Sequence, residues 1–200
     1  YHSKGYQNVT QLGTDLVRQN YPCAVSPLNQ YTVTLTYNDA SISNYWTMLY
    51  AALKNVNAAI DRAPAVITKD ADPDGIDPAV RDKRVGEAKA LRALYLFEIV
   101  RNWGRAPLMI SEPMAPTTTA EISDGAAFYT QIIKDLTDAI AILPKKPTGT
   151  DFGRMSASAA KHLRALVYLT RGYQPYADAN DFTNAYNDDV DVINNSGYSL

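Results

Sequence analysis

Ala88-Lys-Ala-Leu-Arg-Ala-Leu94 recurs as Ala160-Lys-His-Leu-Arg-Ala-Leu166, with one mismatch in seven positions and an offset of 72 residues. The offset is close to twice the roughly 34-residue period of tetratricopeptide helix pairs. Small alanines at matching places let neighbouring helices approach closely, which stacked helix pairs require. Chance similarity is the alternative, because Ala, Leu and Arg are common in helices. The repeat predicts an all-α fold of tetratricopeptide-like helix pairs stacked as an α-α superhelix.

Apolar residues recur at helical spacing along most of the chain. Between Ile42 and Ile60 they alternate steps of four and three, which keeps them on one face of a helix. Asp77 followed by Pro78 marks another helix start, because a carboxylate caps free amides and proline fits the first turn. No β-hairpin signal of comparable strength appears. The spacing predicts helices over about 44–62, 78–103, 123–143, 156–173 and 181–193.

The N-terminal region is expected to be irregular. Residues 1–41 mix Gly, Pro, Asn, Thr and Tyr without a sustained helical period, although Leu12 to Val17 could make a short turn of helix. We therefore expect a single region over 1–200, mostly loop in 1–41 and helical repeats in 42–200. Because the chain begins at Tyr1 rather than Met and ends just after a turn-like stretch, both ends look cut from a longer protein.

Composition and charge exclude several classes of protein. With 46% hydrophobic and 20% charged residues, the chain can form one sizeable core. A formal net charge of −2, with no basic cluster larger than Lys145-Lys146, argues against nucleic acid as a partner. No stretch approaches the roughly 20 apolar residues that span a bilayer, and no signal-peptide pattern opens the chain. The single cysteine, Cys23, excludes an internal disulfide and a cysteine-built zinc site.

Candidate catalytic residues share no motif. The two histidines are His2, at the terminus, and His162, inside a predicted helix, and the sequence does not bring them together. Asp151-Phe152-Gly153 matches a kinase metal-binding triplet, but the other kinase segments are missing, so we interpret it as a turn. A helical glycoside hydrolase would need two carboxylates facing each other across a cleft. The sequence predicts a protein that is not an enzyme and uses no cofactor, with solvated carboxylates at Glu87, Glu98, Glu112 and Glu121.

An acidic stretch imitates the opening of a calcium-binding loop. Asp70, Asp72, Asp74 and Gly75 have the spacing in which alternate carboxylates and a glycine turn wrap a cation. The twelfth position of such a loop, where a bidentate Glu belongs, is Arg81. We favour a solvated acidic connector, with weak calcium binding at the three aspartates as the alternative.

The aromatic residues point to binding. Fourteen tyrosines stand against four phenylalanines, so most rings carry a hydroxyl that can face water or a ligand. We expect Trp46, Tyr50 and Tyr95, on apolar helix faces, to belong to the core. For the tyrosines of the N-terminal loops, packing and ligand binding are both open. The candidate ligand-binding residues are Asn20, Tyr21, Asn29, Tyr31 and Tyr37.

Several stretches together resemble one family, and they follow one another over residues 42–200. They are Asn44-Tyr-Trp-Thr-Met-Leu-Tyr50 with Asn55-Val-Asn57, the segment 84–95 with Asn102-Trp-Gly-Arg-Ala-Pro107, the segment 129–144, and Phe152-Gly-Arg-Met-Ser156 with 160–169. In this order they resemble the SusD/RagB family of Bacteroidetes outer-membrane nutrient-binding proteins.

The resemblance implies a role as well as a fold. SusD-like proteins are lipid-anchored at the cell surface, where they cap a TonB-dependent, SusC-like transporter and pass it glycans or, in RagB-like members, peptides. The expected function is thus non-catalytic capture of an oligosaccharide such as a starch-like glycan. Cys23 follows Gln-Asn-Tyr-Pro and not an apolar lipobox, so the membrane is expected as a partner only through an anchor absent from this chain. The family is also longer, with a C-terminal portion that supplies further ligand contacts.

Two other binding functions remain open at this point. A RagB-like protein would take a peptide, and a tetratricopeptide adaptor would grip a partner in a concave groove. An adaptor predicts Lys, Arg and Asn side chains along its inner helices. The repeated motif offers four cations for that role, which could equally form ion pairs across stacked helices: Lys89, Arg92, Lys161 and Arg164.

Overall fold

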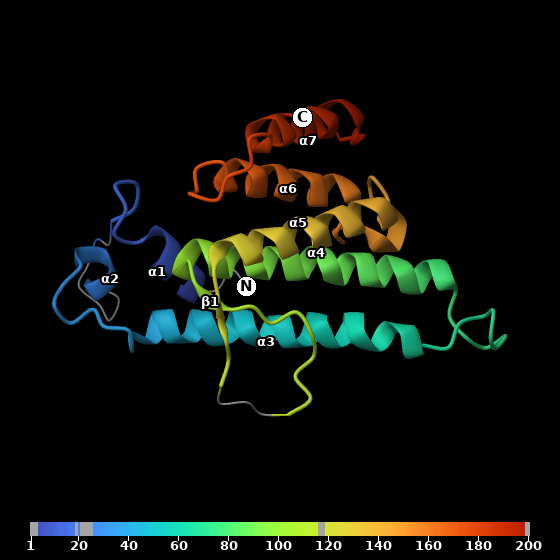
Figure 1. Cartoon of the computed structure of the whole chain (residues 1–200), viewed down its shortest axis with the longest axis horizontal. Coiled ribbons are helices and arrows are strands. Elements are labelled where there is room, and N and C mark those ends of the chain that lie inside the picture. The colour runs from blue at the N-terminus through green and yellow to red at the C-terminus, as the bar shows by residue number, and fades with distance from the viewer. Residues whose placement is uncertain (1–3, 19, 21–25, 116–118, 199–200) are drawn as a thin grey trace. The chain divides into compact units, whose positions relative to one another are not determined.

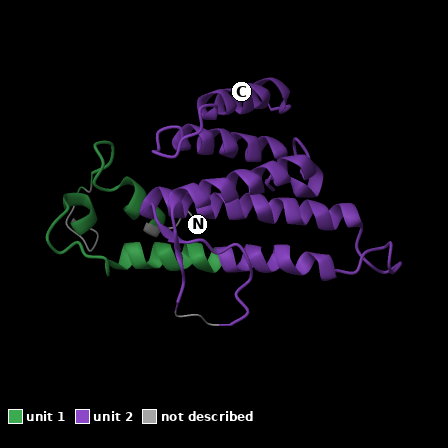
Figure 2. Ribbon diagram, viewed as in Figure 1, with its two compact units in different colours: residues 1–52 green, residues 53–200 purple. Residues whose placement is uncertain are grey.

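The computed structural model describes residues 4–18, 20, 26–115 and 119–198, and these residues are mainly helical. Two compact units divide the chain, residues 1–52 and residues 53–200 (Figure 2), where the sequence analysis expects a single region. The boundary falls inside helix α3. The helices are α1 (Lys4–Gln11), α2 (Ser26–Gln30), α3 (Ala40–Arg62), α4 (Pro78–Trp103), α5 (Gly125–Ile142), α6 (Ala157–Arg171) and α7 (Asp181–Asn195).

The second unit is a stack of helix pairs, as the repeat predicts. Helices α4, α5, α6 and α7 lie side by side in chain order (Figure 1). The only paired strands among the described residues are two residues each, β1 (Ala106–Pro107) and β2 (Ile122–Ser123), which pair antiparallel at the two ends of the α4–α5 connection. The fold is therefore the expected one of stacked helix pairs.

Helix starts and stops follow the residues that signal them. Asp77 accepts a hydrogen bond from the amide of Ala79 at 2.8 Å, and Pro78 opens α4. Asp124 and Ser156 cap α5 and α6 in the same manner. At the end of α4, Gly104 has a φ of +70°, a left-handed backbone that suits glycine. These local signals explain why the predicted boundaries lie within a few residues of the observed ones.

Alanines allow close contact between the stacked helices. Ala90, Ala93, Ala160 and Ala165 are at most 1% exposed, and all four belong to the repeated motif. Larger apolar side chains fill the layers between the helices. They include Leu96, Phe97, Ile99, Phe128, Ile132, Leu136 and Val167.

The buried face of α3 includes Leu49, Leu53 and Val56, as the spacing predicts, but near the start of the helix Tyr45 is buried in place of Trp46. Tyr45 is fully buried, whereas Trp46 and Tyr50 are half-buried and their ring centroids lie 4.6 Å apart. Tyr95 is also half-buried. Burial raises the pKa of the Tyr50 and Tyr95 hydroxyls above the usual range. The core expectation for these three side chains therefore holds only in part, because each remains partly exposed.

The N-terminal residues contain more helix than expected. Helix α1 precedes the stretch from Leu12 to Val17, which does not itself form a helix. The helix lies before Leu12 for a local reason. Gly13 has a φ of +78°, and a Cβ there would lie 2.6 Å from the carbonyl oxygen of Leu28. Because the backbone turns so tightly at Gly13, the helix has to end before it.

Ion pairs join the two helices within each pair, and the pair of Arg92 with Asp135 is the most deeply buried of the four. Arg92 of α4 donates from Nε and Nη2 to both carboxylate oxygens of Asp135 on α5, each at 2.7 Å. Arg164 of α6 holds Asp188 of α7 with the same two distances. Lys89 pairs with Asp138 and Lys161 with Asp191 one helical turn away. The four cations that an adaptor would use for its partner are thus engaged within the helix pairs.

The first of these pairs also holds the α4–α5 connection. Arg92 donates from Nη1 to the carbonyl of Ile110 at 2.8 Å and to Asn57 Oδ1 at 3.2 Å. Asn57, fully buried, donates to the carbonyls of Met109 and Ser111 at 3.0 and 3.1 Å. One arginine therefore fixes α4 to α5 and to an otherwise irregular segment.

Removal of one partner of this pair is expected to destabilise the second unit strongly. Arg92 and Asp135 have side chains 7% and 1% exposed. Arg92→Met or Asp135→Asn should lower the free energy of unfolding by about 3–5 kcal/mol, because the remaining group stays buried without its partner. Lys134→Ala, on the exposed side of α5, is the matched control and should cost less than about 1 kcal/mol. Urea unfolding followed by circular dichroism measures both, and equal losses in the two variants would contradict the role given to Arg92.

Candidate functional site

The candidate ligand-binding residues lie in the first unit. Asn20 is exposed in a bend, and Asn29 is half-buried in α2. Tyr31 and Tyr37 are 69% and 87% exposed. Tyr21 lies outside the described residues, as does Cys23. Two aromatic rings from the predicted set therefore face solvent within this unit.

Tyr31 is held in an uncommon conformation. Its φ of +50° is the only positive one at a non-glycine residue in the described part of the chain. The Tyr31 hydroxyl donates to the carbonyl of Gly13 at 3.1 Å, and the missing side chain of Gly13 makes room for the tyrosine ring. A left-handed backbone at such a residue costs on the order of 1–3 kcal/mol and persists only where surrounding contacts enforce it. Tyr31 thus presents a fixed ring to solvent.

The surroundings of Tyr31 suit a ligand with both apolar and hydroxyl groups. Val33 is 98% exposed, and the hydroxyls of Thr32 and Thr34 lie 2.7 Å apart. Leu16, in the turn that follows Gly13, is 89% exposed. An exposed ring can stack on the apolar face of a sugar, while neighbouring hydroxyl and amide groups bond to its hydroxyls. The sequence indicated the residue types here, but not the strained backbone of Tyr31.

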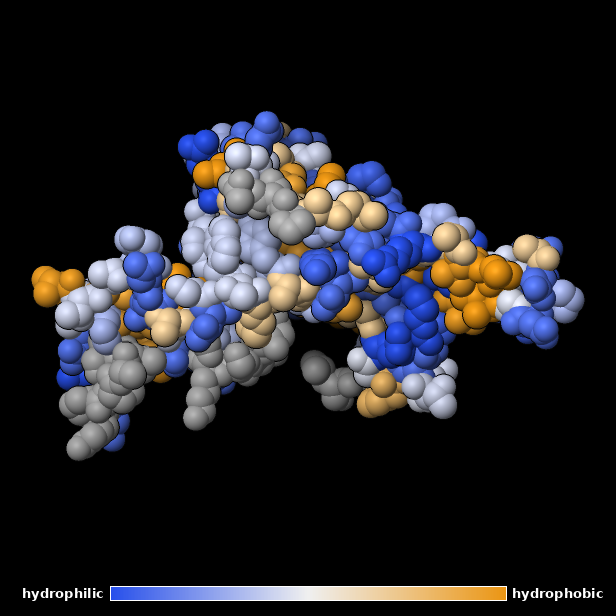
Figure 3. Space-filling view, turned by 90° about the horizontal axis from the view of Figure 1, so that it is seen from below, coloured by the Kyte–Doolittle hydropathy of each residue, from blue (hydrophilic) through white to orange (hydrophobic). Residues whose placement is uncertain are grey.

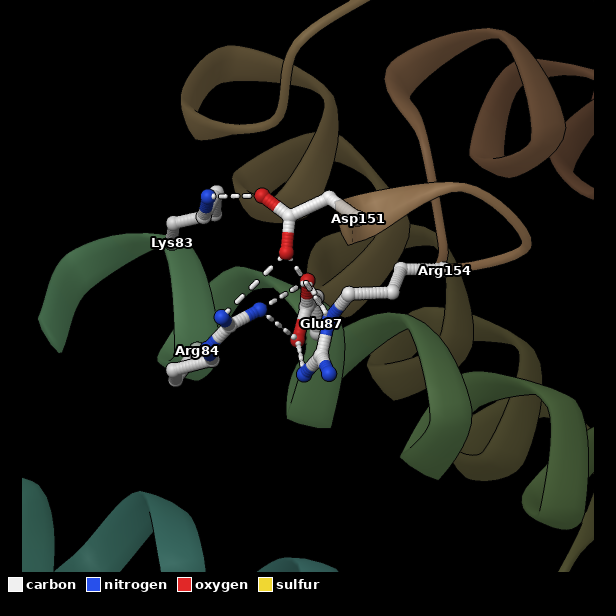
Figure 4. Close-up of polar contacts among 5 residues, drawn as sticks. All are labelled: Lys83, Arg84, Glu87, Asp151 and Arg154. Atoms are coloured by element: carbon white, nitrogen blue, oxygen red, sulfur yellow. Dashed lines mark hydrogen bonds and ion pairs between the residues drawn. The ribbon is translucent and has the colours of Figure 1, made fainter. Parts of the chain in front are cut away.

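A charged cluster in the second unit was not expected from the sequence. Glu87 of α4 accepts from Arg84 at 2.9 Å and from Arg154 Nε at 2.8 Å. Asp151 accepts from Lys83 at 2.6 Å and from Arg84 at 3.3 Å (Figure 4). Gly153, with a φ of +85°, makes the turn that carries Asp151 and Arg154 back to α4, which confirms the interpretation of Asp151-Phe152-Gly153 as a turn. The cluster ties this turn to α4.

The carboxylates of this cluster are held in their ionised form. Burial alone would raise the pKa of Glu87, but hydrogen bonds from Arg154 and Arg84 outweigh it and keep the pKa below its usual value. The hydrogen bond from Lys83, with a further one from Arg84, lowers the pKa of Asp151. A glycosidase needs one carboxyl group that stays protonated near neutral pH to act as the acid. The pair Glu87 and Asp151 does not meet that requirement.

Three hollows border the N-terminal half of α4, and the cluster contributes to each. Arg84 lines a hollow of about 380 Å³, Glu87 and Arg154 line one of about 450 Å³, and Lys83 and Asp151 line one of about 460 Å³. The first also has an apolar wall, and Figure 3 shows hydrophobic residues gathered at that end of the second unit, where the α3–α4 connection lies. No aromatic side chain lines any of these three hollows. They offer ion pairs and aliphatic walls, and no surface for ring stacking.

The acidic connector does not form a metal site in the described residues. Asp72 accepts a hydrogen bond from the amide of Asp74 at 2.9 Å, and the segment folds on itself through a bridge between Thr68 and Ile76. Within the described ranges, no three side chains of His, Cys, Asp or Glu gather as metal ligands, Asp70 included.

No described helix is both long and apolar enough to cross a bilayer.

Comparison with known proteins identifies the family. A family model described as "Starch-binding associating with outer membrane" matches residues 3–169. The chain belongs to the SusD-like family. Its members are binding proteins without catalytic activity, associated with the outer membrane. The resemblance seen in the sequence is thereby confirmed.

Individual relatives show how much of the family's length this chain covers. A SusD-like protein of Bacteroides ovatus is 30% identical over 190 residues, which are 90% of this chain and 31% of that protein. SusD-like protein P25 of Formosa agariphila is 26% identical over 165 residues, 78% of this chain and 30% of that protein. The chain thus spans under a third of the length of these relatives.

Solved structures agree in fold. A laminarin-binding SusD-like protein matches with a TM-score of 0.73 and 27% identity, over 88% of this chain and 36% of that one. A structure with a xylogluco-oligosaccharide matches with a TM-score of 0.78 at 22% identity, over 98% of this chain and 38% of that one. The second likeness concerns the fold alone. The stacked helix pairs of the SusD-like chain are therefore shared with proteins of known structure.

Acidification should reduce the stability that the ionised Glu87 contributes, and a Glu87 variant measures this contribution. A carboxylate whose pKa is lowered by folding stabilises the protein above its unfolded pKa of about 4, and this contribution is lost as the pH falls through the folded value. Glu87→Gln should therefore be less stable than the parent chain at pH 7, with the difference shrinking as the pH falls below about 5. Urea unfolding at pH 7 and pH 3.5 measures the difference, with the exposed Glu121→Gln as control. An unchanged difference at the two pH values would show that Glu87 does not titrate as described.

Proposed function

We propose that the protein captures an oligosaccharide at the outer face of the outer membrane through the exposed aromatic residues of its first unit. Tyr31 carries the proposal, because its ring is exposed and its backbone is held in a strained conformation. Strain of this kind is found where a function requires a fixed side chain. Tyr37, Asn20 and Asn29 are proposed as additional contacts, and Tyr21 as a further one outside the described residues.

The chemistry of the two units supports this assignment. The first unit exposes tyrosine rings beside hydroxyl and amide groups, which suit a sugar. In the second unit the repeat cations are bound to aspartates, and the three hollows beside α4 have no aromatic lining. The family relationship supports the same ligand class, since one relative is a laminarin-binding protein.

A pre-positioned ring favours binding without a large surface. When a side chain is already fixed, the ligand does not have to order it, so less of the contact energy is lost on association. Stacking on one or two rings gives a modest affinity that permits release. We propose that release is to a SusC-like, TonB-dependent transporter, with a lipid anchor that holds the whole protein at the membrane.

Loss of the Tyr31 ring should weaken binding of the oligosaccharide. Tyr31→Ala in the full-length, non-lipidated protein is expected to raise the Kd about two- to tenfold, which corresponds to the roughly 0.5–1.5 kcal/mol of an aromatic contact. Tyr37→Ala should have an effect in the same direction. Phe152→Ala is the matched control, since Phe152 is an aromatic residue 81% exposed in the second unit. Calorimetry with the best glycan from an array measures all three, and a Kd unchanged in both tyrosine variants would remove these residues from the site.

Gly13 should matter for binding because its lack of a side chain leaves room for the Tyr31 ring. Gly13→Ala introduces a Cβ at a φ of +78° and within 2.8 Å of the Tyr31 ring, so the ring has to move. We expect weaker oligosaccharide binding with little change in the unfolding of the second unit. Gly149→Ala, at a φ of +60° with nothing within 4 Å of a Cβ, is the control for backbone strain alone. Equal Kd values for the Gly13 variant and the parent would contradict a positioning role.

An initial screen decides between glycan and peptide ligands. The full-length protein is offered a glycan array and a peptide library, and hits are followed by calorimetry. A saturable glycan hit supports the proposal. A peptide-only hit favours the RagB-like alternative, and cleavage of a glycan would contradict a purely binding role.

A further inference from the structure

The hollow of about 380 Å³ beside α4 differs in its lining from the other two. Its polar side chains are three arginines, Arg62, Arg81 and Arg84, and we call it the arginine hollow. Its other lining residues are all aliphatic: Ala58, Ala59, Ala63, Val66, Ile76 and Val85. Each of the other two hollows contains a carboxylate in its lining, Glu87 or Asp151. Of the three, only the arginine hollow therefore offers a ligand cations and aliphatic groups without an acidic residue.

The carboxylates that pair with two of these arginines lie outside the lining of the hollow. Arg62 donates from Nε to Glu112 at 2.8 Å, and its Nη2 pairs with the same carboxylate. Arg84 donates to Glu87 at 2.9 Å and to Asp151 at 3.3 Å (Figure 4). None of these three carboxylates lines the arginine hollow. Within the part of the chain that the structure describes, Nη1 of Arg62 makes no hydrogen bond, so Arg62 keeps a donor for a ligand.

Arg81 is held by the weakest of these ion pairs. Its Nε donates at 2.9 Å to Asp82, its neighbour in the sequence, whose side chain is 51% exposed. An ion pair at such an exposed position contributes little to stability, because water screens the charges and the paired side chains lose freedom. A ligand carboxylate can therefore replace Asp82 at Arg81 without breaking a contact between helices.

The position of Arg81 in α4 is unfavourable for the helix itself. Free amides give the start of a helix a partial positive charge, so carboxylates are favoured there and cations are not. The first turn of α4 contains no acidic residue, and Arg81, Lys83 and Arg84 all fall within its first two turns. An anion bound beside Arg81 reduces the repulsion among these charges.

We infer that the arginine hollow binds an aliphatic carboxylate, whose charged group lies between Arg62 and Arg81 and whose hydrocarbon part lies against the aliphatic lining. Guanidinium groups bind carboxylates through paired, charge-assisted hydrogen bonds, and the aliphatic lining removes the hydrocarbon part from water. The volume of about 380 Å³ is near the lower end of the range for small-molecule pockets, so the ligand carries one short or branched chain. A neutral sugar lacks the group that the arginines recognise, so this ligand differs from the one proposed for Tyr31.

Calorimetry with the full-length, non-lipidated protein tests the inference. Hexanoate should bind saturably, whereas hexanol, which has the same chain without the charge, should not. Arg81→Met should raise the Kd of hexanoate about tenfold or more, because hydrogen bonds to a charged group are lost. Arg105→Met is the matched control, since Arg105 is an exposed arginine of the second unit that does not line the hollow, and it should leave the Kd unchanged.

Two natural sources share this chemistry, a free short-chain acid and the C-terminal residue of a peptide that ends in Leu, Ile or Val. A tripeptide that ends in leucine, offered with a free C-terminus and as its amide, distinguishes them. Binding of the free tripeptide, lost in the amide, identifies a peptide terminus as the source. Binding of hexanoate without binding of the tripeptide identifies a free acid. Both results support the inference.

Three results would overturn the inference. They are a failure of both hexanoate and the free tripeptide to bind, binding of hexanol as tight as that of hexanoate, and an equal change of the Kd in the two arginine variants. If Arg81→Met unfolds the protein, which circular dichroism detects, Ala59→Asp is compared with Ala59→Asn, because Ala59 is exposed and lines the hollow. The added carboxylate should weaken hexanoate binding about fivefold more than the amide of the same shape, since like charges repel. Equal Kd values in these two variants would contradict the inference.

Discussion

The bidentate contact of Arg92 with Asp135 constrains more of the second unit than any other single contact described. A buried guanidinium has to satisfy several donors, and Arg92 does so by reaching α5, Asn57 and the carbonyl of Ile110. Each partner is thereby fixed in direction as well as distance, because the guanidinium is planar and rigid. Replacing such a pair by apolar groups can leave stability unchanged, whereas removing one partner does not. The pair therefore specifies how α4 meets α5, while apolar burial supplies most of the stabilising free energy.

The repeat of this contact at Arg164 and Asp188 relates the two helix pairs, and the differences between the pairs are informative. The connection 104–124 is longer than 172–180, and its first part is bonded to Asn57, Asp61 and Arg62 of α3. A long connection of this kind would otherwise expose many unpaired backbone groups. The carbonyls of this connection accept the hydrogen bonds of the Asn57 side-chain amide. Asn57 can therefore be fully buried although its side chain is polar. The second connection is held by Asp181, which pairs with Arg171 at the end of α6 and accepts a hydrogen bond from the amide of Asp178 at 2.8 Å.

Sequence reasoning reached the features that depend on local signals. Caps such as Asp77, the glycine at 104 and the repeated motif act over a few residues, so helix positions and stacked pairs could be predicted. It did not identify which carboxylate each cation of the motif would choose, since Arg92 and Asp135 are 43 residues apart. The cluster of Glu87 and Arg154 spans 67 residues and was missed for the same reason. Tyr31 was selected by residue type, but its positive φ depends on the turn at Gly13 and has no signature in a single sequence.

The distribution of charge favours the proposed assignment of ligand binding to the loops of the first unit. A helical stack can bind partners through cations on its surface, but here the cations of the motif lower the free energy of the stack by pairing with aspartates of the neighbouring helix. A ligand that took one of them would have to break a contact that holds the scaffold. Loop residues do not take part in the contacts between helices. Tyr31 shows how a loop side chain can still be rigid, through one hydrogen bond to Gly13 and a constrained backbone. In the proposed assignment, stability and recognition depend on different residues, so ligand preference can change through the loops while the helix pairs keep their contacts.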